Sequence, residues 1–245
     1  MIGSIRHLLN WQHLASERYK SERFCKRYDA WKRCCYDNGG FAQKIFPAIK
    51  PNGVCVELGA GTGFLTRILA KECTKVYAYD RAGAMIDFAK KQFELEGITN
   101  VEFDVCDHMS VNPKEKADLV VAGWSLLSSA NPNWELEWLG ILNELVEHTF
   151  ALLNDRGTFA VITTASMFGE LPPGQIYLPR RKMMLEALQR DYGFIPHFVD
   201  TRWVFDSVRH KRRMLRFWGG RGLVQQGSPH DNTVKESVAV YIKRI

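Results

Sequence analysis

The sequence predicts an α/β fold, in which a doubly wound, mostly parallel sheet of seven strands, the last one antiparallel, follows an N-terminal helical extension. From residue 53 onward, short apolar runs alternate with longer segments of helical period. The runs are almost continuously apolar, as are strands that helices cover on both faces. A regular order of strand, helix and strand builds an open sheet with helices on both sides.

Five runs rich in Val, Ile, Phe and Tyr predict the first five strands. Between them, apolar residues three and four positions apart predict helices, as at Leu65, Ile68 and Leu69. The five runs are VCVEL (54–58), KVYAYD (75–80), VEFDV (101–105), DLVVAGW (118–124) and GTFAVITT (157–164).

The rhythm changes after the fifth strand, where a Pro-rich stretch replaces the short connections. We expect two more strands there, joined by a basic helix and a polar loop that contains glycines. In chain order, the expected elements are the Pro-rich loop (169–179), a helix (180–192), a strand (197–205), the basic helix (207–218), the polar loop (219–233) and a final strand (237–245).

The first fifty residues predict one or two helices. An apolar stripe at i, i+4, i+7 and i+11 marks one helix face, formed by Phe24, Tyr28, Trp31 and Cys35. Packing against the core would explain this stripe, and so would a lid over the carboxyl ends of the strands, where open α/β sheets bind their ligands. We therefore divide the chain into an N-terminal helical extension or lid (1–50) and a main domain (51–245).

The composition is that of a globular chain. With 245 residues, of which 46% are hydrophobic and 24% charged, it can build one sizeable core. Its longest apolar runs are shorter than the roughly 18 residues that cross a bilayer, and the first ten residues lack the apolar stretch of an export signal. We expect no membrane partner and a cytoplasmic location.

Cysteine and histidine usage predicts neither disulfides nor a metal centre. The six cysteines show no paired CxxC spacing, so we expect free and mostly buried thiols. The seven histidines are scattered, and a metal site would need further ligands at a workable spacing. No metal is therefore expected.

The net charge of +6 is unevenly distributed. Residues 1–35 contribute +5 and residues 180–221 contribute +7, while the rest of the chain carries −6. The segment VRHKRRMLRFW (208–218) places Arg and Lys beside aromatic residues, which suits RNA phosphates and bases. It could equally hold a small anion or face solvent.

A glycine-rich turn, CVELGAGTGFLT (55–66), follows the first strand. A phosphate-binding P-loop is excluded because Phe64 follows Gly63 where that motif needs a lysine. A dinucleotide fold is disfavoured because Phe64 also takes the place of its third glycine, although Asp80 lies where such folds place a ribose-binding acid. Glu57, two residues before the glycines, would repel a pyrophosphate and suits a cationic ligand.

The stretch ELGAGTG (57–63) resembles the first motif, E/D-x-G-x-G-x-G, of the Rossmann-like class I S-adenosylmethionine-dependent methyltransferases. The resemblance covers about residues 50–165. It implies S-adenosylmethionine as the cofactor and S-adenosylhomocysteine as its product. The cofactor-binding residues that it implies are Glu57, Gly59, Ala60, Gly61, Gly63, Asp80, Arg81, Met85, Asp107, His108, Gly123 and Trp124.

The resemblance also implies separate roles for these residues. Asp80 would accept hydrogen bonds from both ribose hydroxyls, and Met85 would pack on the adenine. Asp107 would accept from the adenine amino group, with the backbone of His108 beside it. The methionine part and the reacting methyl group would be bordered by Gly123 and Trp124.

The catalytic residue is not evident, because the sulfonium itself supplies the reactivity and the protein mainly aligns the reactants. His108 is a candidate general base. A pocket for a flat or apolar acceptor is expected from Tyr28, Trp31 and Trp203, and residues 169–235 would elaborate the acceptor side of the domain.

We expect a small-molecule acceptor ahead of a nucleic acid, because no separate RNA-binding module is present. The segment after the fourth strand also lacks the Asn/Asp-Pro-Pro-aromatic motif of many nucleic-acid and protein N-methyltransferases. Three alternatives remain: an RNA methyltransferase that uses the basic segment 208–218, a non-catalytic S-adenosylmethionine-binding scaffold, and an NAD-binding protein. No oligomeric state is predicted.

Overall fold

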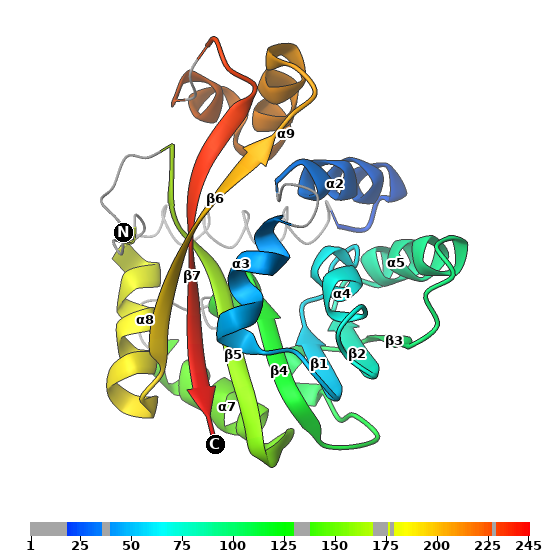
Figure 1. Ribbon diagram of the computed structural model, residues 1–245, viewed down its shortest axis with the longest axis vertical. Helices are drawn as coiled ribbons and strands as arrows, with labels where there is room; N and C mark the ends of the chain where they lie inside the picture. Colours follow the sequence, from blue (N-terminus) through cyan, green and yellow to red (C-terminus); the bar gives the residue numbers. More distant parts are fainter. Residues whose placement is uncertain (1–18, 36–39, 130–137, 169–175, 177–178, 227–228) are drawn as a thin grey trace, which may run out of the picture. The chain divides into compact units, whose positions relative to one another are not determined.

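The computed structural model describes residues 19–35, 40–129, 138–168, 176, 179–226 and 229–245 (Figure 1). Residues 1–18 of the N-terminal segment lie outside these ranges, as does most of the predicted Pro-rich loop at 169–179. Within the described part, no helix is both long enough and apolar enough to cross a membrane.

Seven strands form one sheet in the order β3-β2-β1-β4-β5-β7-β6, which confirms the predicted fold class. β1 pairs in parallel with both β2 and β4, β2 pairs in parallel with β3, and β7 runs antiparallel to β6. The strands are β1 (Val54–Leu58), β2 (Lys75–Asp80), β3 (Val101–Val105), β4 (Ala117–Gly123), β5 (Leu153–Met167), β6 (Ile195–Val204) and β7 (Thr233–Arg244).

Helices occupy the connections between the strands, as the apolar spacing predicts. α5 packs on β2 and β3, α4 packs on β2, and α3 packs on β6 and β7. The described helices are α2 (Glu22–Cys35), α3 (Gly40–Ile49), α4 (Phe64–Leu69), α5 (Gly83–Leu95), the 3₁₀ turn η2 (His108–Ser110), α6 (Leu126–Ser129), α7 (Trp138–Ala151), α8 (Pro179–Tyr192) and α9 (Val208–Gln226).

The predicted polar loop at 219–233 is wrong over its first half, because α9 continues to Gln226. Each helical glycine costs only about 1 kcal/mol relative to alanine, and a helix that already has several turns gains one hydrogen bond per added residue. β7 also begins at Thr233 instead of residue 237, because it pairs with β6 over ten residues, from Thr233 opposite Val204 to Ile242 opposite Ile195.

The chain forms two compact units. Unit 1 comprises residues 1–29, 51–159 and 245, and unit 2 comprises residues 30–50 and 160–244. The predicted division at residue 50 follows a different boundary and stays a prediction.

The core of unit 1 lies along the three central parallel strands. β1, β2 and β4 are almost entirely buried, as their continuous apolar sequences predict. The five cysteines whose side chains the structure describes are free thiols; Cys25, Cys55 and Cys73 are buried, and Cys34 and Cys106 are half-buried.

Unit 2 contains a buried carboxylate, Glu236 on β7, as the centre of a hydrogen-bond network. Its oxygens accept hydrogen bonds from Trp203 Nε1 and from Thr164 Oγ1, both at 2.7 Å. Burial raises the pKa of Glu236, while these hydrogen bonds and the nearby charge of Lys32 oppose the rise. The ring of Trp31 packs edge-on against that of Trp203, with centroids 5.5 Å apart.

Candidate functional site

The glycine-rich turn at the carboxyl end of β1 has a backbone that only glycine adopts readily. Gly59, Gly61 and Gly63 have φ angles of +80°, +57° and +82°. These angles lie in the left-handed region, where a side chain costs roughly 1–2 kcal/mol per residue. The alternation of glycines in the sequence therefore has a conformational cause, independent of any ligand.

The three glycines differ in what a side chain would meet. A Cβ at Gly59 would lie 2.2 Å from the Cβ of Ser125, and one at Gly63 would lie 2.6 Å from the ring of Phe93. Among the residues that the structure describes, a Cβ at Gly61 would meet only the ring of Tyr28, at 3.8 Å. Gly59 and Gly63 are thus required by packing, whereas Gly61 borders space into which a ligand can approach the backbone.

Asp80, at the end of β2, ties two turns together. Its Oδ2 accepts a hydrogen bond from the backbone N–H of Gly61 and its Oδ1 accepts one from that of Ala82, each at 2.8 Å. Burial raises the pKa of Asp80, and the two backbone hydrogen bonds and the charge of Arg81 oppose the rise. The carboxylate therefore lies between the glycine-rich turn and the start of α5.

Glu57 is buried, with 2% of its surface exposed. Its Oε2 accepts a hydrogen bond of 2.6 Å from the hydroxyl of Thr66 in α4. This contact joins the end of β1 to α4, the helix that follows the glycines. Glu57 therefore supports the glycine-rich turn from within the protein.

Asp107 and His108 follow β3 at the same end of the sheet. Asp107 is exposed and caps η2 by accepting a hydrogen bond from the backbone N–H of Met109 at 3.1 Å. His108 is buried, and its Nε2 would lie 3.5 Å from a Cβ at Gly59. Burial lowers the pKa of His108 to about 4, with a smaller lowering from Arg81 and an opposing effect of Asp107. The imidazole is therefore neutral near pH 7.

Met85 lies on the buried face of α5, in a hydrophobic cluster with Cys25 and Phe88. Three aromatic rings from the N-terminal segment pack against this cluster: Tyr19, Phe24 and Tyr28. The thiol of Cys25 also donates a hydrogen bond to the carbonyl oxygen of Ala84 at 3.6 Å. The first half of α2 thus covers the residues that directly follow Asp80.

At the carboxyl end of β4, Gly123 leaves room for Leu65, which would lie 2.8 Å from an added Cβ. Trp124 follows with a φ of +56°, an uncommon angle for a tryptophan. The next residue, Ser125, donates a hydrogen bond from its hydroxyl to the carbonyl oxygen of Leu58. Strained residues often gather at ligand sites, and this one stands beside the glycine-rich turn.

Part of the chain matches a known protein family. Residues 55–147 match a family model described as a methyltransferase domain. An uncharacterized protein of Methanocaldococcus jannaschii is 33% identical over 113 residues, which are 45% of this chain and 41% of that protein. Residues 55–147 are therefore a methyltransferase domain of the class I, S-adenosylmethionine-dependent type.

The match covers less than half of the length of each of these curated relatives. The chain spans 41% of the length of the M. jannaschii protein, and 23% and 24% of two other curated relatives. The sequence resemblance is nevertheless confirmed, and S-adenosylmethionine is the cofactor of the family.

Two solved structures share the fold at low sequence identity. A precorrin 8w decarboxylase of Methanobacterium thermoautotrophicum is 19% identical, with 82% of this chain and 87% of that chain covered and a TM-score of 0.51. The [4+2]-cyclase SpnF is 16% identical, with 82% and 77% covered and a TM-score of 0.52. Because a decarboxylase and a cyclase share the fold, the fold alone does not establish methyl transfer.

The three aromatic residues predicted to line the pocket for the methyl acceptor belong to different units. Tyr28 belongs to unit 1 and lies beside Gly61, whereas Trp31 and Trp203 belong to unit 2 and are 3% and 2% exposed. Trp31 also stacks on Trp218, with ring centroids 3.9 Å apart. The acceptor pocket predicted from all three rings stays a prediction.

Sequence reasoning missed Ser125, Phe93 and Arg67, which hold the turn of the methyltransferase domain from behind. Arg67 donates a hydrogen bond of 3.1 Å to the carbonyl oxygen of Thr62, between the second and third glycines. The sequence contained no signal for these contacts beyond the position of Arg67 in the helix after the turn.

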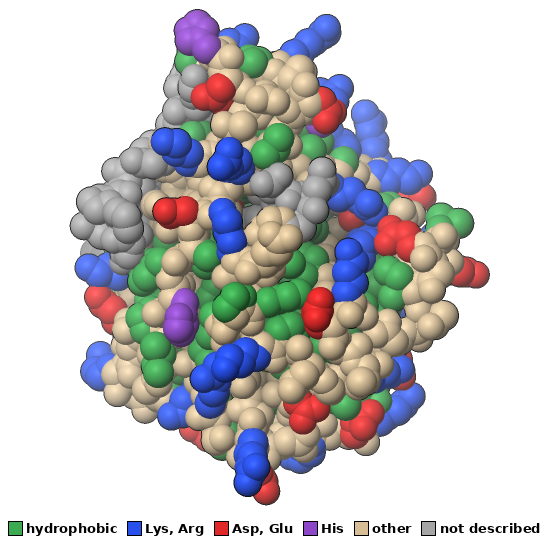
Figure 2. All heavy atoms as spheres, viewed as in Figure 1, with side chains coloured by type: hydrophobic (Ala, Val, Ile, Leu, Met, Phe, Trp, Pro, Cys, Tyr) green, Lys and Arg blue, Asp and Glu red, His purple; other side chains and the backbone are tan. Residues whose placement is uncertain are grey.

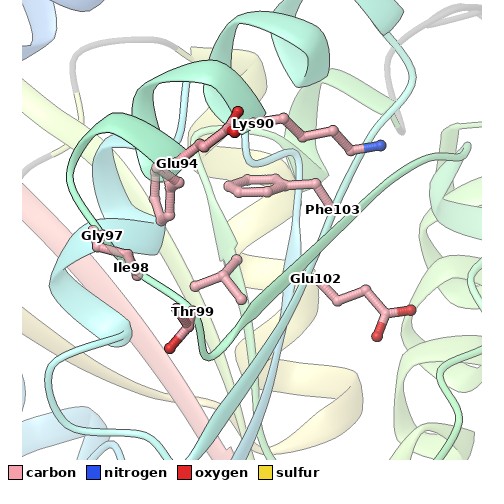
Figure 3. A pocket seen from close by; sticks show the side chains of 9 residues that line it. Lys90, Glu94, Gly97, Ile98, Thr99, Glu102 and Phe103 are labelled. Carbon is pink, nitrogen blue, oxygen red and sulfur yellow. The ribbon is translucent and has the colours of Figure 1, made fainter.

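A pocket on unit 1 lies away from this site (Figure 3). It is lined by the end of α5, including Lys90 and Glu94, and by the amino-terminal half of β3 with its preceding loop. The cofactor-binding residues predicted from the sequence lie at the opposite, carboxyl ends of the strands. Among the described residues, no three His, Cys, Asp or Glu side chains are grouped so that they could hold a metal ion.

We predict that Gly61→Ala impairs donor binding more than stability. The added methyl group has room beside Tyr28, so the cost to folding is the left-handed backbone, roughly 1–2 kcal/mol. The same methyl group would occupy the approach to the backbone, so the affinity for S-adenosylhomocysteine should fall at least tenfold. Calorimetric titration and urea unfolding measure the two effects. Gly97→Ala, also at positive φ but in open space, is the control and should leave affinity unchanged.

We predict a pH-dependent contribution of His108 to stability. The unfolded chain takes up a proton on this histidine below pH 6.5, whereas the native protein does so only near pH 4. The free energy of unfolding should therefore decrease as the pH falls from 6.5 to 4, by up to about 3 kcal/mol. His108→Gln should remove this part of the pH dependence in urea unfolding. An equally steep decrease in the variant would contradict the assignment.

Proposed function

We propose that this protein transfers the methyl group of S-adenosylmethionine to a small-molecule acceptor. The observation that carries the donor half is the open backbone at Gly61, bordered by the carboxylate of Asp80. The match of residues 55–147 to a methyltransferase domain supports the same reaction.

Asp80 has the remaining acceptor capacity that a ribose requires. Each carboxylate oxygen can accept two hydrogen bonds, and each takes one from a backbone N–H in this structure. One acceptor position per oxygen is left for the two ribose hydroxyls. Asp107 would take the adenine amino group, and Met85 would contribute to the apolar wall on the α5 side.

The charge of the site suits a cation. Glu57 and Asp80 both lie at the glycine-rich turn, while His108 is neutral near pH 7. Bound S-adenosylmethionine supplies an activated methyl group, which an acceptor displaces in line as a neutral thioether leaves. His108 could accept a proton from the acceptor, although a base with a pKa of about 4 drives proton removal weakly near pH 7.

A small acceptor is favoured because the first half of α2 covers the carboxyl ends of the strands in unit 1, where the donor would bind. The first half of α2 packs on Met85 and Phe88, and Tyr28 stands beside Gly61. Aromatic side chains of this kind line small-molecule sites and exclude water from them. Tyr28 is the acceptor-side residue that we propose in unit 1.

A single titration series tests the donor assignment. S-Adenosylhomocysteine should bind the purified protein, and NADH should not. Asp80→Asn should weaken binding about tenfold or more, because an amide nitrogen replaces one oxygen that accepts from a hydroxyl. Asp104→Asn, at an exposed carboxylate on the neighbouring strand, should change nothing. Tight NADH binding, or no S-adenosylhomocysteine binding, would refute the proposal.

An RNA acceptor is the second candidate, and the exposed face of α9 favours it. Arg209, Arg212, Arg213 and Arg216 fall within an arc of about 100° on an ideal helix, opposite the buried Lys211, Met214 and Leu215. No acidic side chain of the described part forms an ion pair with these four. Figure 2 shows Lys and Arg side chains around the part of the view that α9 occupies in Figure 1. Uncompensated arginines suit phosphates, which they bind through two parallel hydrogen bonds.

Methyl incorporation into bulk tRNA and rRNA across a salt series separates the two acceptors. For a small-molecule enzyme we expect no incorporation, and replacing Arg209, Arg213 and Arg216 with Glu should leave donor binding unchanged. For an RNA enzyme, incorporation would decrease steeply with salt and would be lost in this triple variant. Lys71, Lys90 and Lys91, changed together to Glu, provide a control with the same change in net charge on exposed positions. A non-catalytic scaffold would bind the donor and methylate neither class.

A further inference from the structure

Arg67 in α4 lies behind the glycine-rich turn and makes four contacts there. Its side chain is 14% exposed. Nη1 donates to the carbonyl oxygen of Thr62 at 3.1 Å and lies 3.7 Å from Oδ1 of Asp29. Nε forms an ion pair of 2.7 Å with Glu96, and the guanidinium carbon lies 4.7 Å from the ring centroid of Phe93.

These contacts fix the shape of the turn. The backbone N–H of Arg67 donates to the carbonyl oxygen of Gly63 at 3.0 Å, while its side chain holds that of Thr62. Two consecutive carbonyl groups of the turn are therefore oriented by one residue. Phe93, which the guanidinium covers, fills the space where Gly63 has no side chain.

The same side chain also contacts the first half of α2, which belongs to unit 1. Asp29 is 8% exposed in its side chain and directly follows Tyr28, whose ring is the neighbour of Gly61 on the ligand side. An ion pair with so little solvent contact is weakly screened. Arg67 thus joins the rear of the turn to the helix that covers its front.

We propose that Arg67 is a positioning residue for donor binding. It holds the Thr62 carbonyl in place and, through Asp29, keeps Tyr28 against Gly61. The inference rests on the proposed function, because it concerns the affinity of the donor site. Glu96 binds Nε of the same guanidinium and is 32% exposed in its side chain, so solvent screens this ion pair more than the one with Asp29.

The experiment compares three single variants and one double variant by calorimetric titration with S-adenosylhomocysteine. Arg67→Met should raise the dissociation constant about tenfold or more, and Asp29→Asn should raise it severalfold. Glu96→Gln, which weakens the ion pair on the solvent side, should stay within twofold of the wild type. In the double variant Asp29→Asn/Arg67→Met, the effect of Asp29→Asn should largely disappear, because its partner is already absent.

Hydrogen exchange distinguishes positioning from simple stabilisation. S-Adenosylhomocysteine should slow amide exchange over residues 22–29 in the wild type and in Glu96→Gln, but not in Arg67→Met. If Arg67→Met does not fold, Arg67→Lys replaces it, and its single ammonium should restore only part of the affinity.

Two results would overturn the inference. One is an affinity of a folded Arg67 variant within twofold of the wild type, and the other is equal losses in Asp29→Asn and Glu96→Gln. If the wild type itself does not bind S-adenosylhomocysteine, the proposed function fails instead. The two failures are therefore distinguishable.

Discussion

The carboxylate of Asp80 is the constraint on which the rest of the ligand site depends. Its two oxygens accept from the backbone of Gly61 and of Ala82, which belong to different strand-helix turns. The carbonyl oxygen of Asp80 also accepts from the backbone N–H of Cys106, at the end of β3. One residue therefore sets the spacing of three turns at the carboxyl ends of parallel strands, where ligands of open α/β sheets bind.

Charge and burial at this site act together. Glu57 is buried and Asp80 is half-buried, and their oxygens accept hydrogen bonds from neutral donors, namely the hydroxyl of Thr66 and two backbone N–H groups. A cationic ligand recovers part of the cost of burying these carboxylates, whereas a pyrophosphate would add to it. The neutral state of His108 keeps a competing positive charge out of the same space.

The sequence predicts the first half of the fold almost residue by residue. β1, β2 and β3 have their predicted bounds. β1 and β2 are buried parallel strands, which are short apolar runs, and β1 ends before Gly59 while β2 ends at Asp80. β3 is an edge strand in which only Phe103 is buried, and its Val and Phe residues mark it as a strand. In the second half of the fold, the element bounds depend less on local sequence. The length of β7 depends on its pairing with β6, and the end of α9 depends on helix propagation through glycines. Pairing partners of this kind are not encoded in the segment itself.

The candidate site divides in the same way. The glycines and Asp80 follow from a local motif, because a ligand that approaches backbone restricts the residue types within a few positions. Ser125 and Arg67 act on the turn from other elements or from the following helix, with hydrogen bonds to backbone carbonyls that many residue types could make. Their roles depend on tertiary contacts, which the local sequence does not specify.

The packing of α3 limits which N-terminal truncations the protein tolerates. Phe41, Ile45 and Ile49 are buried, Lys44 donates to the carbonyl oxygen of Asp200, and α3 lies against the two last strands of the sheet. Residues near position 45 are thus structural partners of residues near position 200. A truncated form that begins at residue 51 would expose the apolar surface of β6 and β7 and would be prone to aggregation. A chimera should therefore take α3 and the β6–β7 pair from the same parent protein.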